Sequence, residues 1–192
     1  MSERMHRNSL FEEDGATKPE ILDVCCGGRM WWWDKAHPLA VYMDKRIAPA
    51  GSSQRRPRWN CDPDLLGDFT AIPFDDEAFQ LVVFDPPHLV RDTPSPASEV
   101  RLRYGELRSS DEQEVLRRGF SECWRVLRAG GTLVFKWWGP LERVACHFPT
   151  TPTVGTQKAS KDPTWWLIFY KPLSGKAEPW RNQLDIYDEA AA

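Results

Sequence analysis

Short apolar runs, each about as long as a β-strand, recur along the chain with helical or loop segments between them. This alternation is typical of a mostly parallel sheet with helices on both faces. The predicted strands are "ILDVCC" (21–26), "LAVYM" (39–43), "DLL" (64–66), "LVVF" (81–84), "TLVFKW" (132–137), "WWLIFY" (165–170) and, with a weaker pattern, "TPTVG" (151–155). The sequence therefore predicts an α/β fold with a mostly parallel sheet of about seven strands.

The clearest helical pattern runs from Ser110 to Arg128. Ser110 and Gln113 fit a capping box, apolar residues recur at helical spacing, and Gly130-Gly131 follows as a stop signal. A shorter helix is expected over Leu141 to Cys146. Residues 89–109 show no periodicity and predict a long loop over the carboxyl ends of the strands, of the kind that forms lids or binding segments.

The length of 192 residues suits one domain. We expect it over residues 20–172, with an N-terminal extension over 1–19 and a C-terminal tail over 173–192. No apolar run approaches the roughly 20 residues that span a bilayer, and the polar start is no signal peptide, so we expect a cytoplasmic protein without a membrane partner. The five cysteines form no CxxC pair and no zinc spacing, which predicts free thiols and no metal site.

The net charge of −3 argues against a broad electrostatic surface for nucleic acid. A local basic patch, "QRRPR" at 54–58, is explained equally well by a solvated loop and by a phosphate contact. Ten tryptophans are many for this length, and most should pack in the core. Trp31 to Trp33 and Trp137-Trp138 follow predicted strands, so one or two of these rings could sandwich a base.

Polar residues follow four predicted strands at the point where each ends. Asp23 leads into "CCGG", and the next strands end in Asp44-Lys45-Arg46, Asp68-Phe69 and Asp85-Pro86-Pro87-His88. Ligands bind at the carboxyl ends of strands in open α/β sheets. A glycine turn after the first strand and an acid about 20 residues later predict nucleoside binding, whereas no P-loop lysine and no GxGxxG spacing is present.

The stretches "ILDVCCGG", "VYMDKR", "GDFTAIPFDDEAFQLVVFDPPH" and "GFSECWRVLRAGGTLVFKWW" together resemble the class I S-adenosylmethionine-dependent methyltransferases, over roughly residues 20 to 170. Within that class, "DPPH" is similar to the D-P-P-aromatic motif of the exocyclic amino methyltransferases, which modify adenine N6 or cytosine N4. The chain is also similar to a group of small, single-domain bacterial and phage methyltransferases with a Cys-Cys-Gly turn and D-P-P-H. The resemblance implies a Rossmann-like methyltransferase domain with S-adenosylmethionine as cofactor.

The resemblance also assigns residues to the cofactor and to the methyl acceptor. The turn after the first strand would lie under the methionine part, Asp44 would bind the ribose hydroxyls, and Asp68 with Phe69 the adenine. The implied cofactor-binding residues are Asp23, Val24, Cys25, Cys26, Gly27, Asp44, Lys45, Asp68, Phe69 and Asp85. The chain departs from the family at Cys25 and Arg29, where glycines are usual. We expect Cys25 and Cys26 to be small buried residues rather than nucleophiles.

The residues Asp85, Pro86, Pro87 and His88 are the implied catalytic group. An exocyclic amine is a poor nucleophile because its lone pair is delocalised into the ring. A carboxylate and a backbone carbonyl that each accept one N–H favour the tetrahedral amine of the transition state. Asp85 and the Pro86 carbonyl can serve, Pro-Pro fixes the carbonyl direction, and His88 stands where the family stacks an aromatic ring on the base.

The sequence thus predicts a methyltransferase acting on a base amino group, first of all adenine N6 in DNA. The alternatives are RNA or a small molecule as acceptor, and an idle cofactor-fold protein that binds nucleic acid or a partner. The expected partner is nucleic acid, DNA before RNA, and a homodimer is left open. With no separate recognition domain expected, sequence specificity would come from residues 89–109, from a partner chain, or be absent.

Overall fold

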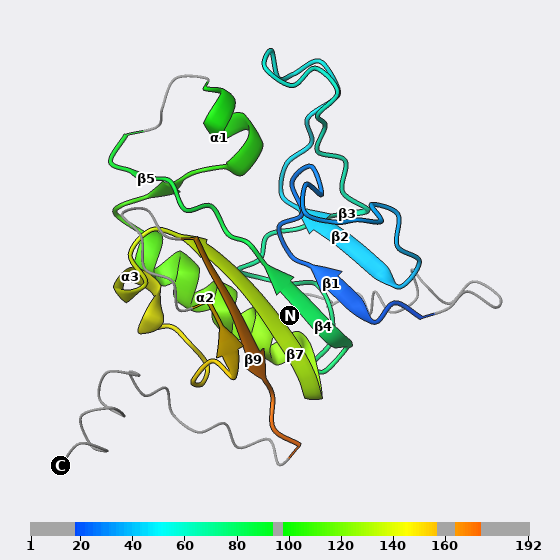
Figure 1. Ribbon diagram of the computed structural model, residues 1–192, viewed down its shortest axis with the longest axis vertical. Coiled ribbons are helices and arrows are strands. Elements are labelled where there is room, and N and C mark those ends of the chain that lie inside the picture. Colours follow the sequence, from blue (N-terminus) through cyan, green and yellow to red (C-terminus); the bar gives the residue numbers. More distant parts are fainter. Residues whose placement is uncertain (1–17, 94–97, 157–163, 174–192) are drawn as a thin grey trace, which may run out of the picture.

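The computed structural model describes residues 18–93, 98–156 and 164–173 (Figure 1). The predicted N-terminal extension and C-terminal tail lie outside these residues, except for their inner ends. Seven strands form one sheet in the order β3-β2-β1-β4-β7-β9-β8. They are β1 (Ile21–Asp23), β2 (Ala40–Asp44), β3 (Leu65–Leu66), β4 (Phe79–Phe84), β7 (Leu127–Trp138), β8 (Val154–Gly155) and β9 (Thr164–Tyr170).

The sheet is mostly parallel, as predicted. Strands β3, β2, β1, β4 and β7 pair in parallel, and β9 runs antiparallel between β7 and β8. The predicted Rossmann-like α/β fold is therefore confirmed. The chain leaves β1 in one direction for β2 and reaches β4 on its other side, so the carboxyl ends of β1 and β4 form a switch point, where ligands bind in such sheets. These ends point toward helix α1 (Glu99–Tyr104) and the loop over residues 45–61 (Figure 1).

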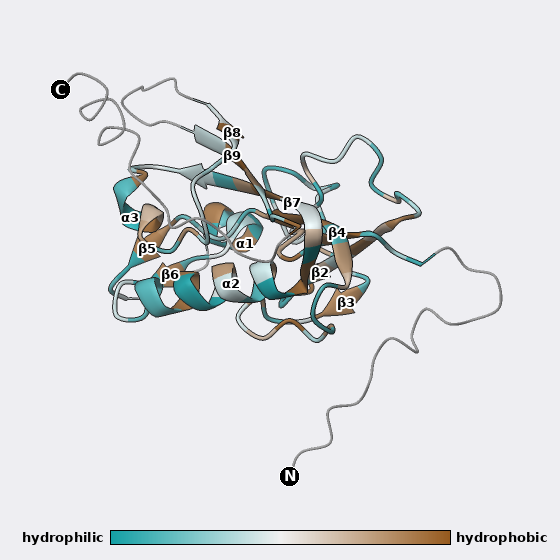
Figure 2. Cartoon of the chain, turned by 90° about the horizontal axis from the view of Figure 1, so that it is seen from below, coloured by the Kyte–Doolittle hydropathy of each residue, from teal (hydrophilic) through white to brown (hydrophobic). Residues whose placement is uncertain are grey.

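Helix α2 (Glu112–Val126) packs against the sheet through a stripe of apolar residues at helical spacing. Its buried side chains include Leu116, Phe120, Cys123 and Val126, and its opposite side carries hydrophilic residues (Figure 2). The predicted capping box is wrong: Asp111 occupies the N-cap and no side chain there makes a capping hydrogen bond.

The end of α2 also differs from the prediction, because β7 begins directly after Val126. Gly130-Gly131 lies inside β7 rather than at a helix end. Gly130 has a φ of 76°, where the β4–β7 register shifts. The positive φ and the register shift together match a β-bulge. A bulge favours a glycine with positive φ, and so does the end of a helix.

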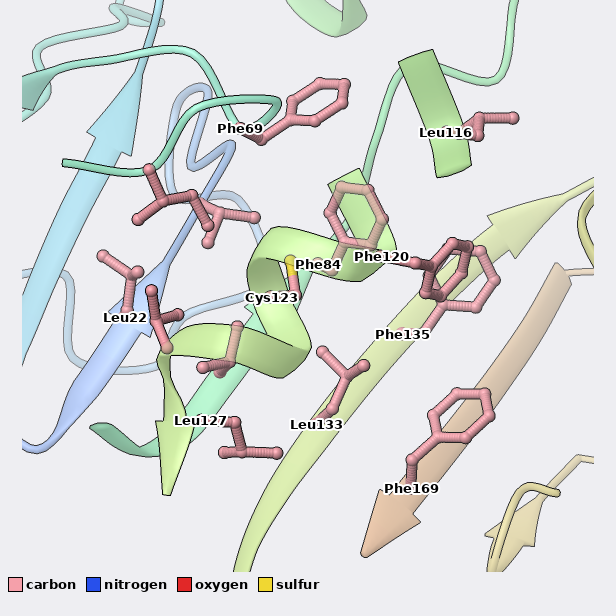
Figure 3. Close-up of a cluster of buried hydrophobic side chains, with 14 of the residues drawn as sticks. Leu22, Phe69, Phe84, Leu116, Phe120, Cys123, Leu127, Leu133, Phe135 and Phe169 are labelled. Atoms are coloured by element: carbon pink, nitrogen blue, oxygen red, sulfur yellow. The ribbon is translucent and has the colours of Figure 1, made fainter. Parts of the chain in front are cut away.

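Aromatic rings join α2 to the centre of the sheet. Phe84 of β4 contacts Phe120 of α2 and Phe69 edge-on, at centroid distances of 5.2 and 5.3 Å. Phe120 also lies 4.8 Å from Phe135 of β7, and Figure 3 shows this cluster between the helix and the strands. A Cβ on Gly119 would come within 2.8 Å of both Phe69 and Phe84, so only glycine permits this close approach. The packing fixes the end of β4, where Asp85 follows.

Residues 89–109, predicted as a long loop, hold regular structure in their described part. Strands β5 (Val90–Arg91) and β6 (Leu107–Arg108) pair in parallel, and α1 lies between them. Residues 24–39, between β1 and β2, run through turns without a helix. Helix α3 (Glu142–Ala145) forms within the predicted 141–146. Among the described residues, no helix is long and apolar enough to cross a membrane.

Candidate active site

A cleft opens at the carboxyl ends of β1, β2 and β4, with about 690 Å³ of space between its atoms, part of it open to solvent. Residues 103–106, at the C-terminal end of α1 and directly after it, also line the cleft. Most of the predicted site residues line it: Val24, Cys25, Cys26, Gly27, Asp44, Lys45, Phe69, Asp85, Pro86, Pro87 and His88. Asp23 and Asp68 do not line it.

Asp23 is fully buried beneath the cleft. Its carboxylate accepts hydrogen bonds from the Trp32 indole at 2.7 Å and the Cys25 backbone N–H at 3.3 Å. Burial raises its pKa to about 7 against these hydrogen bonds. Asp23 therefore holds the turn after β1 in place and is not a ligand group exposed to the cleft. Trp32, one of the tryptophans after this turn, is thereby anchored.

Asp68 is partly exposed and faces its own loop. Its Oδ1 accepts from the Thr70 backbone N–H at 2.9 Å and the Thr70 hydroxyl at 2.8 Å. Lys45 lies 3.9 Å from its other oxygen. Phe69 lines the cleft, but it is 4% exposed and packs on Phe84. Of the two residues predicted to bind the adenine, Phe69 therefore lines the cleft and Asp68 does not.

The turn after β1 brings backbone to the cleft. Gly27 has a φ of 49°, and its N–H donates to Asp44 Oδ2 at 2.9 Å. Arg29 also has a positive φ, 50°, which is unusual for a residue with a side chain. Its guanidinium lies 3.7 Å from the centre of the Tyr42 ring and pairs with Asp64 at 2.7 Å. These contacts hold the Arg29 side chain and offset the strain of its positive φ.

Asp44 ends β2 as a buried carboxylate whose acceptor positions are filled. Besides Gly27, it accepts from the Arg46 backbone N–H at 3.0 Å and from Arg46 Nε and Nη2 at 2.9 and 3.0 Å. Burial raises the pKa of Asp44, but the hydrogen bonds and charge of Arg46 outweigh it, and the pKa lies below its ordinary value. A carboxylate accepts about four hydrogen bonds, so a ligand hydroxyl can reach Asp44 only if Arg46 moves.

Asp85 leaves β4 directly into the cleft and pairs with Lys136 of β7, Oδ2 to Nζ, at 2.7 Å. Burial raises the pKa of Asp85, and the Lys136 charge and hydrogen bond offset only part of that rise. Oδ1 receives no hydrogen bond from the described residues, and neither does the Pro86 carbonyl. One carboxylate oxygen and one carbonyl are therefore available to a ligand amine.

Aromatic side chains surround the end of the "DPPH" turn. The His88 ring lies 5.4 Å from that of Trp138 and 6.0 Å from that of Tyr104. Burial, and then the Lys136 charge, lower the pKa of His88, which favours the neutral imidazole. Trp31 lines the cleft beside Lys136, whereas Trp137 is buried in the core. His88, Tyr104 and Trp138 could thus present ring surfaces to a planar ligand.

Helix α1 is held over the cleft by two sets of contacts. Glu99 accepts from the Ser53 hydroxyl at 2.5 Å and from the Gln54 backbone N–H at 2.6 Å. Arg46 Nη1 donates to the Leu102 carbonyl at 3.2 Å, so one arginine links Asp44 to α1. Of the segment 89–109, which was predicted as a lid, residues 103–106 line the cleft.

Three residues of this site were not predicted from the sequence: Arg46, Lys136 and Tyr104. Lys136 is a lone charge in the apolar run "TLVFKWW", and a charge in a buried strand needs a partner. Arg46 follows the strand-end acid by two residues, a spacing that allows the backbone and side-chain contacts seen here. The cysteines of the turn were predicted to be buried and unreactive. Burial raises the pKa of the Cys25 thiol well above its ordinary value, which disfavours a thiolate.

No protein-family model and no curated protein matches the chain. A solved structure from Pyrococcus horikoshii OT3 is similar with 14% identity over 86% of this chain and 87% of the other, at a TM-score of 0.46. A SAM-dependent methyltransferase from Methanosarcina mazei shows 13% identity over 87% and 97%, at 0.47. The cyclase SpnF shows 12% identity over 87% and 80%, at 0.43. Similarities at such low identity describe the fold and do not indicate what the protein binds.

Proposed function

We propose that the protein is an S-adenosylmethionine-dependent methyltransferase whose acceptor is the exocyclic amino group of a base, with adenine N6 in DNA as the first candidate. The observation that carries this proposal is the cleft itself. A glycine turn with a buried carboxylate, Asp44, and an acceptor pair, Asp85 with the Pro86 carbonyl, open into the same space. The glycine turn and Asp44 suit a nucleoside cofactor, and Asp85 with the Pro86 carbonyl suits an amine.

The residues at the ends of β1 and β2 fit the cofactor in their chemistry. The backbone of Gly27 would face its methionine part, Asp44 its ribose hydroxyls, and Phe69 its adenine. The Arg46 guanidinium occupies the acceptor positions of Asp44 and has to swing away for the hydroxyls to bind. When bound, S-adenosylmethionine supplies a methyl group on a sulfonium, and its sulfur keeps the electron pair of the bond that breaks.

Asp85 and Pro86 would act on the acceptor amine. Asp85 Oδ1 and the Pro86 carbonyl each accept one N–H and direct the nitrogen lone pair toward the methyl group. Both hydrogen bonds strengthen as positive charge develops on nitrogen, so they stabilise the transition state more than the ground state. The raised pKa of Asp85 makes it a suitable first acceptor for the proton that the amine then loses.

Three rings would hold the base in this position. The His88 ring has its centroid 6.0 Å from that of Tyr104 and 5.4 Å from that of Trp138. A neutral imidazole stacks on a base without the desolvation cost of an imidazolium, and its lowered pKa favours that form. Aromatic stacking contributes about 1–3 kcal/mol per base in nucleic-acid complexes. This arrangement supports a base, rather than an aliphatic amine, as acceptor.

The deciding experiment measures transfer of a labelled methyl group from S-adenosylmethionine onto a panel of DNA, RNA and small amines. Digestion of the labelled product identifies the modified base. The Asp85→Asn variant, which keeps size but loses charge, is the matched control. Label on adenine N6 supports the proposal in full, and label on no base with wild-type protein refutes it. Nucleic acid and a second copy of the chain remain predicted partners.

A further inference from the structure

We propose that Lys35, Arg56 and Arg58 bind the backbone phosphates of the nucleic acid whose base enters the cleft. The inference rests on the proposed function for its choice of ligand, but it concerns a separate cavity. It assigns a place to the basic patch at 54–58, which the candidate active site does not use.

A second cavity, with about 880 Å³ of space including its open mouth, adjoins the active-site cleft. Lys35, Arg56 and Arg58 line it together with Trp59 and Asn60, and no carboxylate is among its lining residues. The two cavities share Gly28 and Met30 in their walls. A strand with one base at Asp85 would therefore find its neighbouring phosphates beside three cations.

Among the described residues, these cations make one side-chain hydrogen bond, from Lys35 Nζ to the Gly28 carbonyl at a long 3.5 Å. No described carboxylate forms an ion pair with Lys35, Arg56 or Arg58, whereas Arg29, Arg46, Arg101, Arg117, Arg125 and Arg143 each pair with an acid. Three unpaired cations at one cavity contrast with the net charge of −3 of the whole chain. Clustered positive charge that no carboxylate neutralises is the electrostatic feature that phosphate binding requires.

A second observation comes from Trp59. The residue is 7% exposed, and its buried indole N–H has no hydrogen-bond partner among the described residues. Its Nε1 packs against Gly28, where a Cβ would meet it at 2.2 Å. A buried donor without an acceptor is costly and is usually satisfied by a ligand or water. Trp59 thus places an unused donor in the wall of the second cavity, next to Gly28, which both cavities share.

The same region exposes an aromatic ring. Trp33, two residues before Lys35, is 105% exposed, so it contributes nothing to the core. Its neighbour Trp32 is anchored on Asp23, which fixes the backbone from which Trp33 projects. Exposed rings beside cations are typical of surfaces that bind single-stranded nucleic acid. The loop that carries Arg56 and Arg58 is in turn held by Glu99 through Ser53 and Gln54.

The test compares two double variants in oligonucleotide binding. Arg56→Gln with Arg58→Gln removes two cations from the cavity, and Arg117→Gln with Arg118→Gln removes the same charge from the exposed side of α2. Fluorescence anisotropy follows labelled single-stranded DNA and RNA of one sequence over a range of salt concentrations. Each lost phosphate contact lowers the slope of log affinity against log salt by about 0.7 on single strands.

We expect the cavity variant to bind at least 10-fold more weakly at low salt and to lose about 1.4 from the slope, while the α2 variant keeps wild-type values. Equal losses in both variants, or wild-type binding by the cavity variant, would overturn the phosphate site. Binding is measured without S-adenosylmethionine, so the result does not depend on catalysis. Intact oligonucleotide binding with no methyl transfer would count against the proposed function alone.

Discussion

Lys136 Nζ lies 2.7 Å from Asp85 Oδ2, across the neighbouring strands β7 and β4. The register explains the contact, because Phe84 stands opposite Phe135 and the next residue on each strand is Asp85 and Lys136. The ammonium fixes one carboxylate oxygen and leaves the other free toward the cleft. In the proposed reaction Lys136 is a positioning residue whose charge also lowers the pKa of Asp85 against the effect of burial.

Replacing Lys136 should therefore move the pH dependence of methyl transfer. The ammonium lowers the pKa of Asp85 against the effect of burial, so Lys136→Met raises that pKa further. Because the ionised carboxylate is the form that accepts an N–H, the acid limb of the rate profile shifts to higher pH. Lys136→Arg keeps the charge and should restore the wild-type limb. A profile that is the same in all three proteins would contradict the role of Lys136.

Removal of the Asp85 charge should damage the reaction far more than cofactor binding. Asp85→Asn leaves the glycine turn and Asp44 untouched, so affinity for S-adenosylmethionine stays within a few-fold by calorimetry. Methyl transfer should fall by about 10² or more, as for loss of one preorganised electrostatic group. Glu142→Gln, the same change at an exposed position of α3, serves as control. A fully active Asp85→Asn protein would reduce "DPPH" to a turn.

The sequence predicted those parts of the site that lie directly after a strand. Apolar runs locate the strands, and parallel pairing then brings the acids after them to one edge, which is why Asp44 and Asp85 share a cleft. Side-chain partners depend on register between strands far apart in sequence, so the Asp85–Lys136 pair could not be placed. The glycines after α2 show the same limit, since a bulge in β7 and a helix stop favour the same residue.

The direction of the Asp68 side chain could not be predicted from the sequence for a different reason. Its position after β3 matches the family pattern, but a two-residue strand leaves the direction of the next side chain undetermined. The local hydrogen bonds of Thr70 then decide it. Asp23 differs again, since burial beneath the turn depends on how residues 24–39 fold back without a helix.

Asp44 and Arg46 should affect cofactor affinity in opposite directions. Asp44→Asn removes the charge that binds the ribose hydroxyls and should weaken binding of S-adenosylmethionine several-fold, since leaving such hydroxyls poorly paired costs on the order of 1–3 kcal/mol. Arg46→Gln frees acceptor positions on Asp44 and should strengthen binding at least two-fold. Calorimetry with each variant and with the double variant measures both effects. Weaker binding by Arg46→Gln would show that the arginine supports the carboxylate instead of competing for it.

Burial of Asp23 should make stability depend on pH. Its pKa is about 7 in the folded protein against an ordinary value of 3.8, so between these values the native state holds a proton that the unfolded chain has released. The free energy of unfolding therefore falls as pH rises through this window, by an amount on the order of a few kcal/mol. Asp23→Asn lacks this titration. Thermal unfolding from about pH 4 to about pH 8 should show a downward slope for wild type relative to the variant, and parallel curves would contradict the raised pKa.

The contacts of Glu99 should control how readily α1 opens over the cleft. Glu99 accepts hydrogen bonds from Ser53 and Gln54, and no residue of α1 is buried, so these bonds and the contacts of Leu102 are what hold the helix. Glu99→Ala should increase amide exchange over residues 99–106 at least several-fold, because a segment with few buried contacts opens locally. Exchange in α2, which packs on the sheet through Phe120, is the internal reference and should not change. In wild type, added cofactor and acceptor should slow exchange over 99–106, since the closed segment then covers bound ligand. Equal protection of this segment with and without ligands would separate it from the binding event and leave α1 as a fixed wall of the cleft.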